Sequence, residues 1–203
     1  MSREKPSLPK KPADLPEVSD VRTLRALTHP VRIALLEALT IAGPSTATEL
    51  AELIGETPTT CSFHLRQLAK YGYIEEAGGG KGRQRPWRPS AVGMRLSDTD
   101  DDPGATMAAA ALLEMLRSRQ LKRAATWKQA KSSYPKKWRE AASDSQFLAY
   151  LTAPELKRLN DDIVELVLKR FGPRIADPEK RPADAMPVEM LWFSYPVELA
   201  RPQ

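Results

Sequence analysis

The sequence contains one cysteine, two histidines and no run of 18 apolar residues in a chain of 203. A single cysteine excludes an internal disulfide framework and any metal site built from several thiolates, and it suits a reducing compartment. Without a long apolar run we expect no membrane-spanning helix, and the N-terminus lacks the apolar core of a signal peptide. We therefore expect a cytoplasmic protein with no metal, no other cofactor and no membrane partner.

Catalytic residue patterns are also scarce. Residues 104–203 contain no histidine, and no nucleophile there is paired with a base. The glycine-rich stretch from Gly78 to Lys81 does not satisfy the Gly-x-x-x-x-Gly-Lys-Ser/Thr pattern of a phosphate-binding loop, and no helix is expected directly after it. An enzyme domain in the C-terminal half is therefore disfavoured, and we expect no catalytic residues.

Proline is abundant by contrast, with 18 residues, and Pro6, Pro9, Pro12 and Pro16 all lie near the N-terminus. Charged residues surround these prolines, and the apolar residues between them follow no helical or strand period. Such a segment buries too little apolar surface to offset the entropy lost on ordering. We therefore predict that residues 1–18 form a disordered arm.

Four helical patterns follow between residues 19 and 72. The first starts near Val21 and must end near His29, because proline disfavours a helical conformation in the residue before it. The second starts at Pro30, a favourable first position of a helix, and ends at Gly43. Both carry apolar residues three or four positions apart, which is typical of a helix with one buried face.

The third and fourth patterns have clear first residues. Thr46 and Glu49 have the spacing of a capping box, which predicts a short helix that ends at Gly55. Thr57 before Pro58 predicts a further helix start, and this helix should continue to Tyr71. The core side chains expected from the short third helix are Leu50, Leu53 and Ile54.

A small hairpin is predicted next. Residues 73–76 have the pattern of a short strand, and residues 78–83 are too rich in glycine to form anything but a loop. Residues 84–88 can form the return strand, at an edge because Pro86 cannot donate a ladder hydrogen bond. A hairpin directly after a helix-turn-helix predicts a winged arrangement.

The C-terminal half is predicted to be helical. Asp102 and Pro103 start a long helix that should reach about Lys128, and Thr152 with Glu155 caps a second one that should end at Gly172 and Pro173. Residues 188–197 are dense in large apolar side chains and should form a strand or an extended segment. The expected fold is mainly α with a small β wing: a winged helix-turn-helix over residues 19–97 that folds alone, followed by a helical dimerisation or effector domain over residues 98–203.

The helix from Pro58 to Tyr71 should present two different faces. At 100° per residue, Cys61, Leu65 and Leu68 lie within about 40° of one another and should face the core. The opposite face carries small hydroxyl groups near the helix start, then Arg66, then Lys70. An arginine can bond a guanine edge with two hydrogen bonds, and an exposed Phe63 could contact a thymine methyl.

Basic residues gather in the same part of the chain. Residues 57–95 contain seven lysines and arginines against two glutamates, while the net charge of the whole chain is +5. A local basic surface on a winged helix is typical of a nucleic-acid partner. The residues that we expect to contact double-stranded DNA are Thr59, Thr60, Ser62, Phe63, Arg66, Gln67, Lys70, Lys81, Arg83 and Arg85.

Three segments together resemble the ArsR-type winged-helix regulators. Residues 57–74 resemble the recognition helix of that family, with a hydroxyl-rich start, then His-Leu, then a glycine before an apolar strand. Residues 27–32 resemble the family's start of the second helix, and residues 82–88 resemble the return strand of its wing. The resemblance covers residues 20–95 and implies a bacterial, dimeric transcription regulator that binds an operator of two half-sites. We expect this regulator to act as a repressor.

The chain also departs from that family. Residues 48–53 carry no thiol where the metal sensors have cysteines, so the resemblance is to a non-metal-sensing subgroup with an added C-terminal helical domain. Cys61, His29 and His64 are then expected at structural positions. A winged helix that binds another protein, without reading DNA sequence, stays open as an alternative.

Two features of the C-terminal half leave alternatives open. The four alanines from Ala108 to Ala111 allow close helix packing, either inside the chain or between two copies. Residues 115–139 hold nine basic residues and no acidic one, which can form a solvated face, bind an anionic ligand or add contacts to the DNA backbone. A small-molecule effector is possible but the sequence does not identify it.

Overall fold

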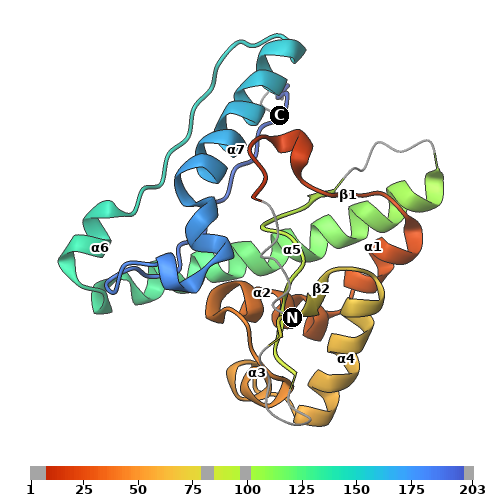
Figure 1. The fold of residues 1–203 in the computed structure, drawn as a ribbon. Helices are drawn as coiled ribbons and strands as arrows, with labels where there is room; N and C mark the ends of the chain where they lie inside the picture. The colour runs from red at the N-terminus through yellow and green to blue at the C-terminus, as the bar shows by residue number, and fades with distance from the viewer. Residues whose placement is uncertain (1–7, 79–84, 97–101, 199–203) are drawn as a thin grey trace.

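The computed structural model describes residues 8–78, 85–96 and 102–198 and is mainly helical (Figure 1). Its helices are α1 (Val21–Leu27), α2 (Pro30–Ala42), α3 (Ala47–Ile54), α4 (Pro58–Lys70), α5 (Pro103–Ala130), α6 (Lys136–Ala141) and α7 (Ala153–Ala176). Its strands are β1 (Glu17–Val18), β2 (Ile74–Glu76), β3 (Trp87–Pro89) and β4 (Arg95–Leu96), with 3-10 turns η1 (Pro12–Asp14), η2 (Lys131–Ser133) and η3 (Pro178–Lys180). The expected fold class, a winged helix-turn-helix followed by helices, is confirmed.

The helix starts follow the capping residues of the sequence. The Thr46 hydroxyl accepts from the Glu49 backbone N–H, and the Glu49 carboxylate accepts from the Thr46 backbone N–H at 2.7 Å. The Thr57 hydroxyl accepts from the Thr60 N–H at 3.1 Å, and a carboxylate oxygen of Asp102 accepts from the Gly104 N–H at 2.8 Å. Each cap satisfies a backbone donor that the first turn leaves without a partner.

In the wing, β3 is hydrogen-bonded both to β2 and to Ser45. β2 and β3 pair antiparallel with Glu75 opposite Arg88. Ser45, between α2 and α3, exchanges two backbone hydrogen bonds with Trp87, of 3.0 and 2.8 Å. The return strand therefore covers residues 87–89 and lies between two partners, so Pro86 precedes it instead of lying within it.

The N-terminal segment corrects one expectation. Residues 12–18, predicted to belong to a disordered arm, form η1 and β1, and β1 pairs in parallel with β4. Val18 is buried in the core, and the Glu17 carboxylate accepts from Arg95 at 2.8 Å. The buried Val18 and the pairing of β1 with β4 order a segment whose prolines, charges and lack of an apolar period predicted disorder.

The core extends across the boundary that the sequence suggested between residues 97 and 98. α5 packs along α1, as the green and red helices of Figure 1 show. Ala105, Ala108, Ala109 and Leu112 of α5 are buried in one cluster with Leu24 of α1. The alanine-rich face is thus used inside the chain, and the first half of α5 belongs to the core of the winged helix.

The C-terminal segments lie against both α2 and α5. α7 continues past Gly172 and Pro173 to Ala176, contrary to expectation, because its last turn is closed by the Asp177 N–H donating to the Pro173 carbonyl at 3.1 Å. Residues 188–197 are extended without forming a strand. The indole of Trp192 and the hydroxyl of Ser194 in this segment both donate to the Asn160 side chain of α7, at 2.9 and 2.7 Å.

Ion pairs and hydrogen bonds hold these parts together. Glu37 of α2 accepts from Arg119 and Arg123 of α5, both at 2.9 Å, and Arg123 also pairs with Glu189. These bonds raise the pKa of Arg123 above its ordinary value. Arg181 donates to the carbonyls of Thr40 and Ile41 at the end of α2. Among the described residues, none of the helices is long and apolar enough to cross a membrane.

Candidate nucleic-acid interface

The helix-turn-helix consists of α3, a tight turn and α4. Gly55 ends α3 with φ +74°, a left-handed conformation that side chains disfavour, and Thr57 caps α4 two residues later. α2 packs against both helices. α4 is therefore held from one side by two helices, and its other side is left open.

One face of α4 is fully buried, as predicted. Cys61, Leu65 and Leu68 each have no exposed surface. Burial raises the pKa of the Cys61 thiol, which keeps it protonated and unreactive as a nucleophile. The three side chains fix the rotation of α4 about its axis, and so determine which residues it presents outward.

The outward face carries the side chains that the sequence singled out. Thr59, Phe63, Arg66 and Lys70 are exposed, while Thr60, Ser62 and Gln67 are half-buried beside them. Phe63 is 52% exposed, an unusual position for a large aromatic residue on a helix without a partner.

The predicted contact residues on α4 differ in how free their polar groups are. Arg66 forms no ion pair with any residue that the structure describes. The Thr60 hydroxyl is 2.8 Å from the Thr57 hydroxyl and helps to cap the helix, and the Lys70 ammonium lies over the Tyr71 ring. Arg66 is therefore the cation of this face most available to a ligand.

The structure separates the wing residues into two groups. Lys81 and Arg83 lie outside the described residues. Arg85 is described, with its side chain 67% exposed, and donates to Glu76 at 2.7 Å, which raises the pKa of its guanidinium. The cation of Arg85 would have to exchange this partner for a phosphate.

The two glutamates of the wing form ion pairs that the sequence pattern did not predict. Arg88 pairs with Glu75 at 2.7 Å across the ladder, with only 13% of its side chain exposed. The opposite positions of the two residues could have been found only from the strand register, which glycine-rich loops leave undetermined.

The prediction that Leu53 of α3 is a core residue was wrong, because its side chain is 60% exposed.

The ring of His29 contacts the ring of His64, a residue of α4. The rings of His29, which caps α2, and His64 lie 4.4 Å apart between centroids. His29 accepts through Nδ1 from the Val31 N–H at 3.2 Å, which makes it a cap of α2. Burial lowers the pKa of both imidazoles, and the nearby Arg32 lowers them further. His29 therefore caps α2, and His64 packs against its ring.

No group of three or more metal-ligating side chains is found in the described part of the chain. The α4 face offers a partner hydroxyl groups, an amide, a ring and two cations, and these groups suit binding.

The family comparison agrees with this geometry. Residues 27–76, about a quarter of the chain, match the family model of a helix-turn-helix domain, from the end of α1 through β2. A search of curated proteins gave no match. The matched segment includes α3, the Gly55 turn and α4, so the chain contains a helix-turn-helix domain, a type of domain typical of DNA-binding regulators.

Proposed function

We propose that the chain is a sequence-specific regulator of transcription that binds double-stranded DNA as a homodimer and represses by occupying an operator. This proposal rests on the open face of α4, where Arg66, Phe63 and Thr59 are exposed on a helix whose other face is fully buried. A helix of this kind fits the major groove, where base edges can be distinguished. The likeness to ArsR-type regulators supports the same function.

The wing adds the contacts that do not read sequence. Lys81, Arg83 and Arg85 lie in or beside the glycine-rich sequence of residues 78–83, a composition unsuited to fixed base contacts but suited to contacts with phosphates or the minor groove. The cluster of basic residues in the wing also argues against the alternative of a pure protein-interaction module.

Selection of bound fragments from random or genomic DNA tests the proposal directly. The purified chain should enrich one pseudo-palindromic motif. Arg66→Ala should weaken binding of that motif by about 1–3 kcal/mol, if the contact to guanine is bidentate. Arg22→Ala, on α1, is the matched control because it removes another exposed arginine that lies outside α4 and outside α7.

The outcomes separate the two functions. Enrichment of a motif, with weakened binding only in Arg66→Ala, supports a sequence-reading regulator. No enrichment and no duplex binding would favour the protein-interaction module. Equal binding by wild type and Arg66→Ala, with the same base preference, would refute the role of Arg66.

Two copies are proposed because one recognition helix reads too few base pairs to select a site in a genome. Fourteen of the nineteen large apolar side chains exposed in the described residues lie between Phe147 and Val197. A monomer rarely leaves so many together in water. Since Ala105, Ala108 and Ala109 of α5 are already buried in the core with α1, the pairing surface is proposed to lie in α7 and the segments flanking it.

Leu166→Glu tests this surface, because Leu166 is 48% exposed on α7. A buried, unpaired charge in the interface should convert the dimer to a monomer and abolish tight operator binding. Ile41→Glu, at a site 53% exposed on α2, is the control and should leave the dimer intact. Light scattering reads the mass, and a variant Leu166→Glu that stays dimeric would place the interface elsewhere.

A further inference from the structure

The nine basic residues of segment 115–139 are not equivalent in the structure. Arg119 and Arg123 pair with Glu37 or Glu189, and Arg117 lies over the Phe193 ring at 5.2 Å. Lys137 pairs with Asp184 at 3.3 Å, and Lys136 with Glu140 at 3.6 Å. These five cations hold the C-terminal segments in place or are balanced within their own helix.

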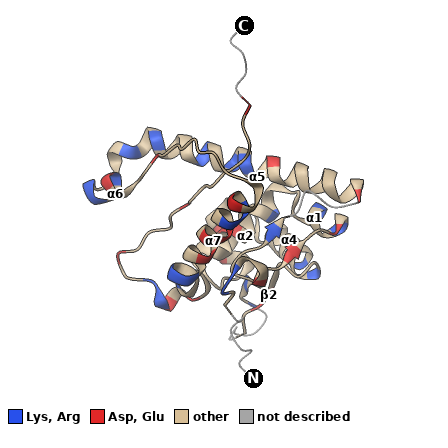
Figure 2. Cartoon of the chain, turned by 90° about the horizontal axis from the view of Figure 1, so that it is seen from above, with Lys and Arg blue, Asp and Glu red and all other residues tan. Residues whose placement is uncertain are grey.

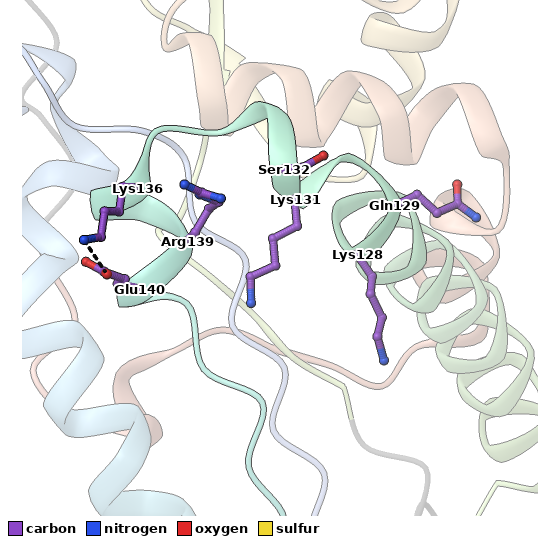
Figure 3. Close-up of a pocket in the computed structure, with 7 residues that line it drawn as sticks. All are labelled: Lys128, Gln129, Lys131, Ser132, Lys136, Arg139 and Glu140. Carbon is purple, nitrogen blue, oxygen red and sulfur yellow. Dashed lines mark ion pairs between the residues drawn. The ribbon is translucent and has the colours of Figure 1, made fainter.

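Three of the remaining cations lie around one hollow at the outer end of α5. Lys128 of α5, Lys131 of η2 and Arg139 of α6 line one open hollow of about 620 Å³, together with Gln129, Ser132, Lys136 and Glu140. Figure 2 shows the basic residues gathered along this end of α5 and on α6, and Figure 3 shows the hollow itself. Within the described residues, Lys128, Lys131 and Arg139 have no acidic partner.

The frame of the hollow is fixed by local packing. The rings of Trp127 and Tyr134 meet edge to face, with centroids 4.6 Å apart, across the turn that joins α5 to α6. The Ser133 hydroxyl donates to the Ala130 carbonyl at 2.7 Å in the same turn. These contacts turn the chain back so that α6 brings Arg139 to the side of Lys131, as Figure 3 shows.

We propose that this hollow is a binding site for phosphate groups, held by Lys128, Lys131 and Arg139. Three cations that have no acidic partner of their own repel one another and attract an anion of several charges, while Glu140 in the lining is paired with Lys136. The planar fork of arginine matches two phosphate oxygens. The Ser132 hydroxyl supplies a further donor. A volume of about 620 Å³ exceeds one phosphate ion and lies in the range of small-molecule sites.

Such phosphates can come from a small phosphorylated molecule or from the DNA backbone, and both present the same chemistry to the three cations. If the anion is the DNA backbone, the proposed site rests on the proposed DNA-binding function. If the anion is a small molecule, the proposed site is independent of that function. The two sources therefore need separate measurements.

Titration calorimetry of the full chain with inorganic triphosphate tests the site itself. Lys131→Gln combined with Arg139→Gln should weaken triphosphate binding at least about tenfold, because two charge-assisted contacts are lost. The control, Arg22→Gln combined with Arg25→Gln on α1, removes the same charge outside the hollow and outside the proposed pairing surface, and should bind as the wild type does. All four positions are exposed, and thermal melts will verify that both variants fold.

The salt dependence of binding to a random duplex identifies the source. If the hollow holds backbone phosphates, the slope of log K against log salt should fall by about 0.9 per phosphate lost in the double variant of the hollow, and not in the control. An unchanged slope with weakened triphosphate binding assigns the site to a small ligand. If the hollow variant changes neither measurement relative to the control, the proposal is overturned. A wild-type chain that binds triphosphate but no duplex would refute the proposed function alone.

Discussion

The first half of α5 is predicted to be indispensable for the stability of the winged helix. Leu112 is fully buried in the cluster that contains Leu24 of α1. Leu112→Ala removes its buried methyl groups and leaves a cavity, which costs about 2–5 kcal/mol in comparable cores. For a chain of this size each kcal/mol lowers Tm by about 2–4 °C, so the melting temperature should fall by about 4–20 °C.

The matched control is Leu121→Ala, which makes the same change on the same helix. The side chain of Leu121 is 54% exposed, so its truncation should cost well under 1 kcal/mol, as is usual for surface sites. Urea unfolding followed by circular dichroism measures both free energies of unfolding. Both variants should keep the wild-type dependence of that free energy on urea.

A truncated chain gives a second test of the same reasoning. A fragment that ends at Asp98 lacks Ala105, Ala108, Ala109 and Leu112, and would expose the α1 side chains that they cover. It should lose cooperative unfolding and bind apolar dyes. Equal stabilities of Leu112→Ala and Leu121→Ala, or a fragment that unfolds in one sharp transition, would refute the assignment of α5 to the core.

Two further predictions concern pH and backbone conformation. Burial lowers the folded-state pKa of His29 and His64 below the ordinary 6.5, so the unfolded chain binds more protons below that pH. The stability that the neutral rings contribute is therefore complete above about pH 6.5 and is lost as the pH falls toward the lowered pKa. The urea midpoint of unfolding should be lower at about pH 5.5 than at about pH 7.5, and this difference should be smaller in His64→Gln. An equal difference in the wild type and in His64→Gln would contradict the lowered pKa of His64. Gly43 has φ +88°, and a Cβ there would lie 2.5 Å from Cγ of Pro178, so Gly43→Ala should cost about 1–3 kcal/mol. Gly172→Ala in α7 meets nothing within 4 Å and should instead stabilise by about 0.5–1 kcal/mol, and melting curves that rank the two variants the other way would be contrary to both arguments.

The sequence determined the local structure of the winged helix well, because local rules decide it. Thr46, Gly55 and Thr57 mark helix ends through hydrogen bonds and backbone conformations that involve only near neighbours. The spacing of Cys61 and Leu65 identified the buried face of α4, and with it the outward face that carries Arg66.

Contacts between distant segments could not be predicted in the same way. Small side chains such as Ala108 allow close packing against any helix, so the alanines could not show whether the partner was α1 or a second copy. The sequence likewise could not show which residues of the basic run are paired with acidic residues, because Glu37 and Glu189 are far away in sequence from the arginines that they bind. Pro173 suggested a helix end, yet the helix continues for three more residues.

The architecture of α5 bears on how a dimer could present its recognition helices. The 28 residues of α5 span about 42 Å at 1.5 Å per residue. Its first half is buried with α1, and its second half is tied through Arg119 and Arg123 to Glu37 of α2. Because α2 also packs against α3 and α4, α5 and the recognition helix are held in one unit.

The other side of α2 is tied in the same way to the C-terminal segments. Arg181 donates to the Thr40 and Ile41 carbonyls at the end of α2, and also to the Arg174 carbonyl of α7 at 2.8 Å. In the proposed dimer, the pairing surface of α7 is thus joined to α4 through one intervening helix. Two copies must place their recognition helices about 34 Å apart to read successive turns of DNA. Rotation of α7 against α2 would change that separation, so in the proposed dimer the contacts of Arg181 and Glu37 would set the half-site spacing.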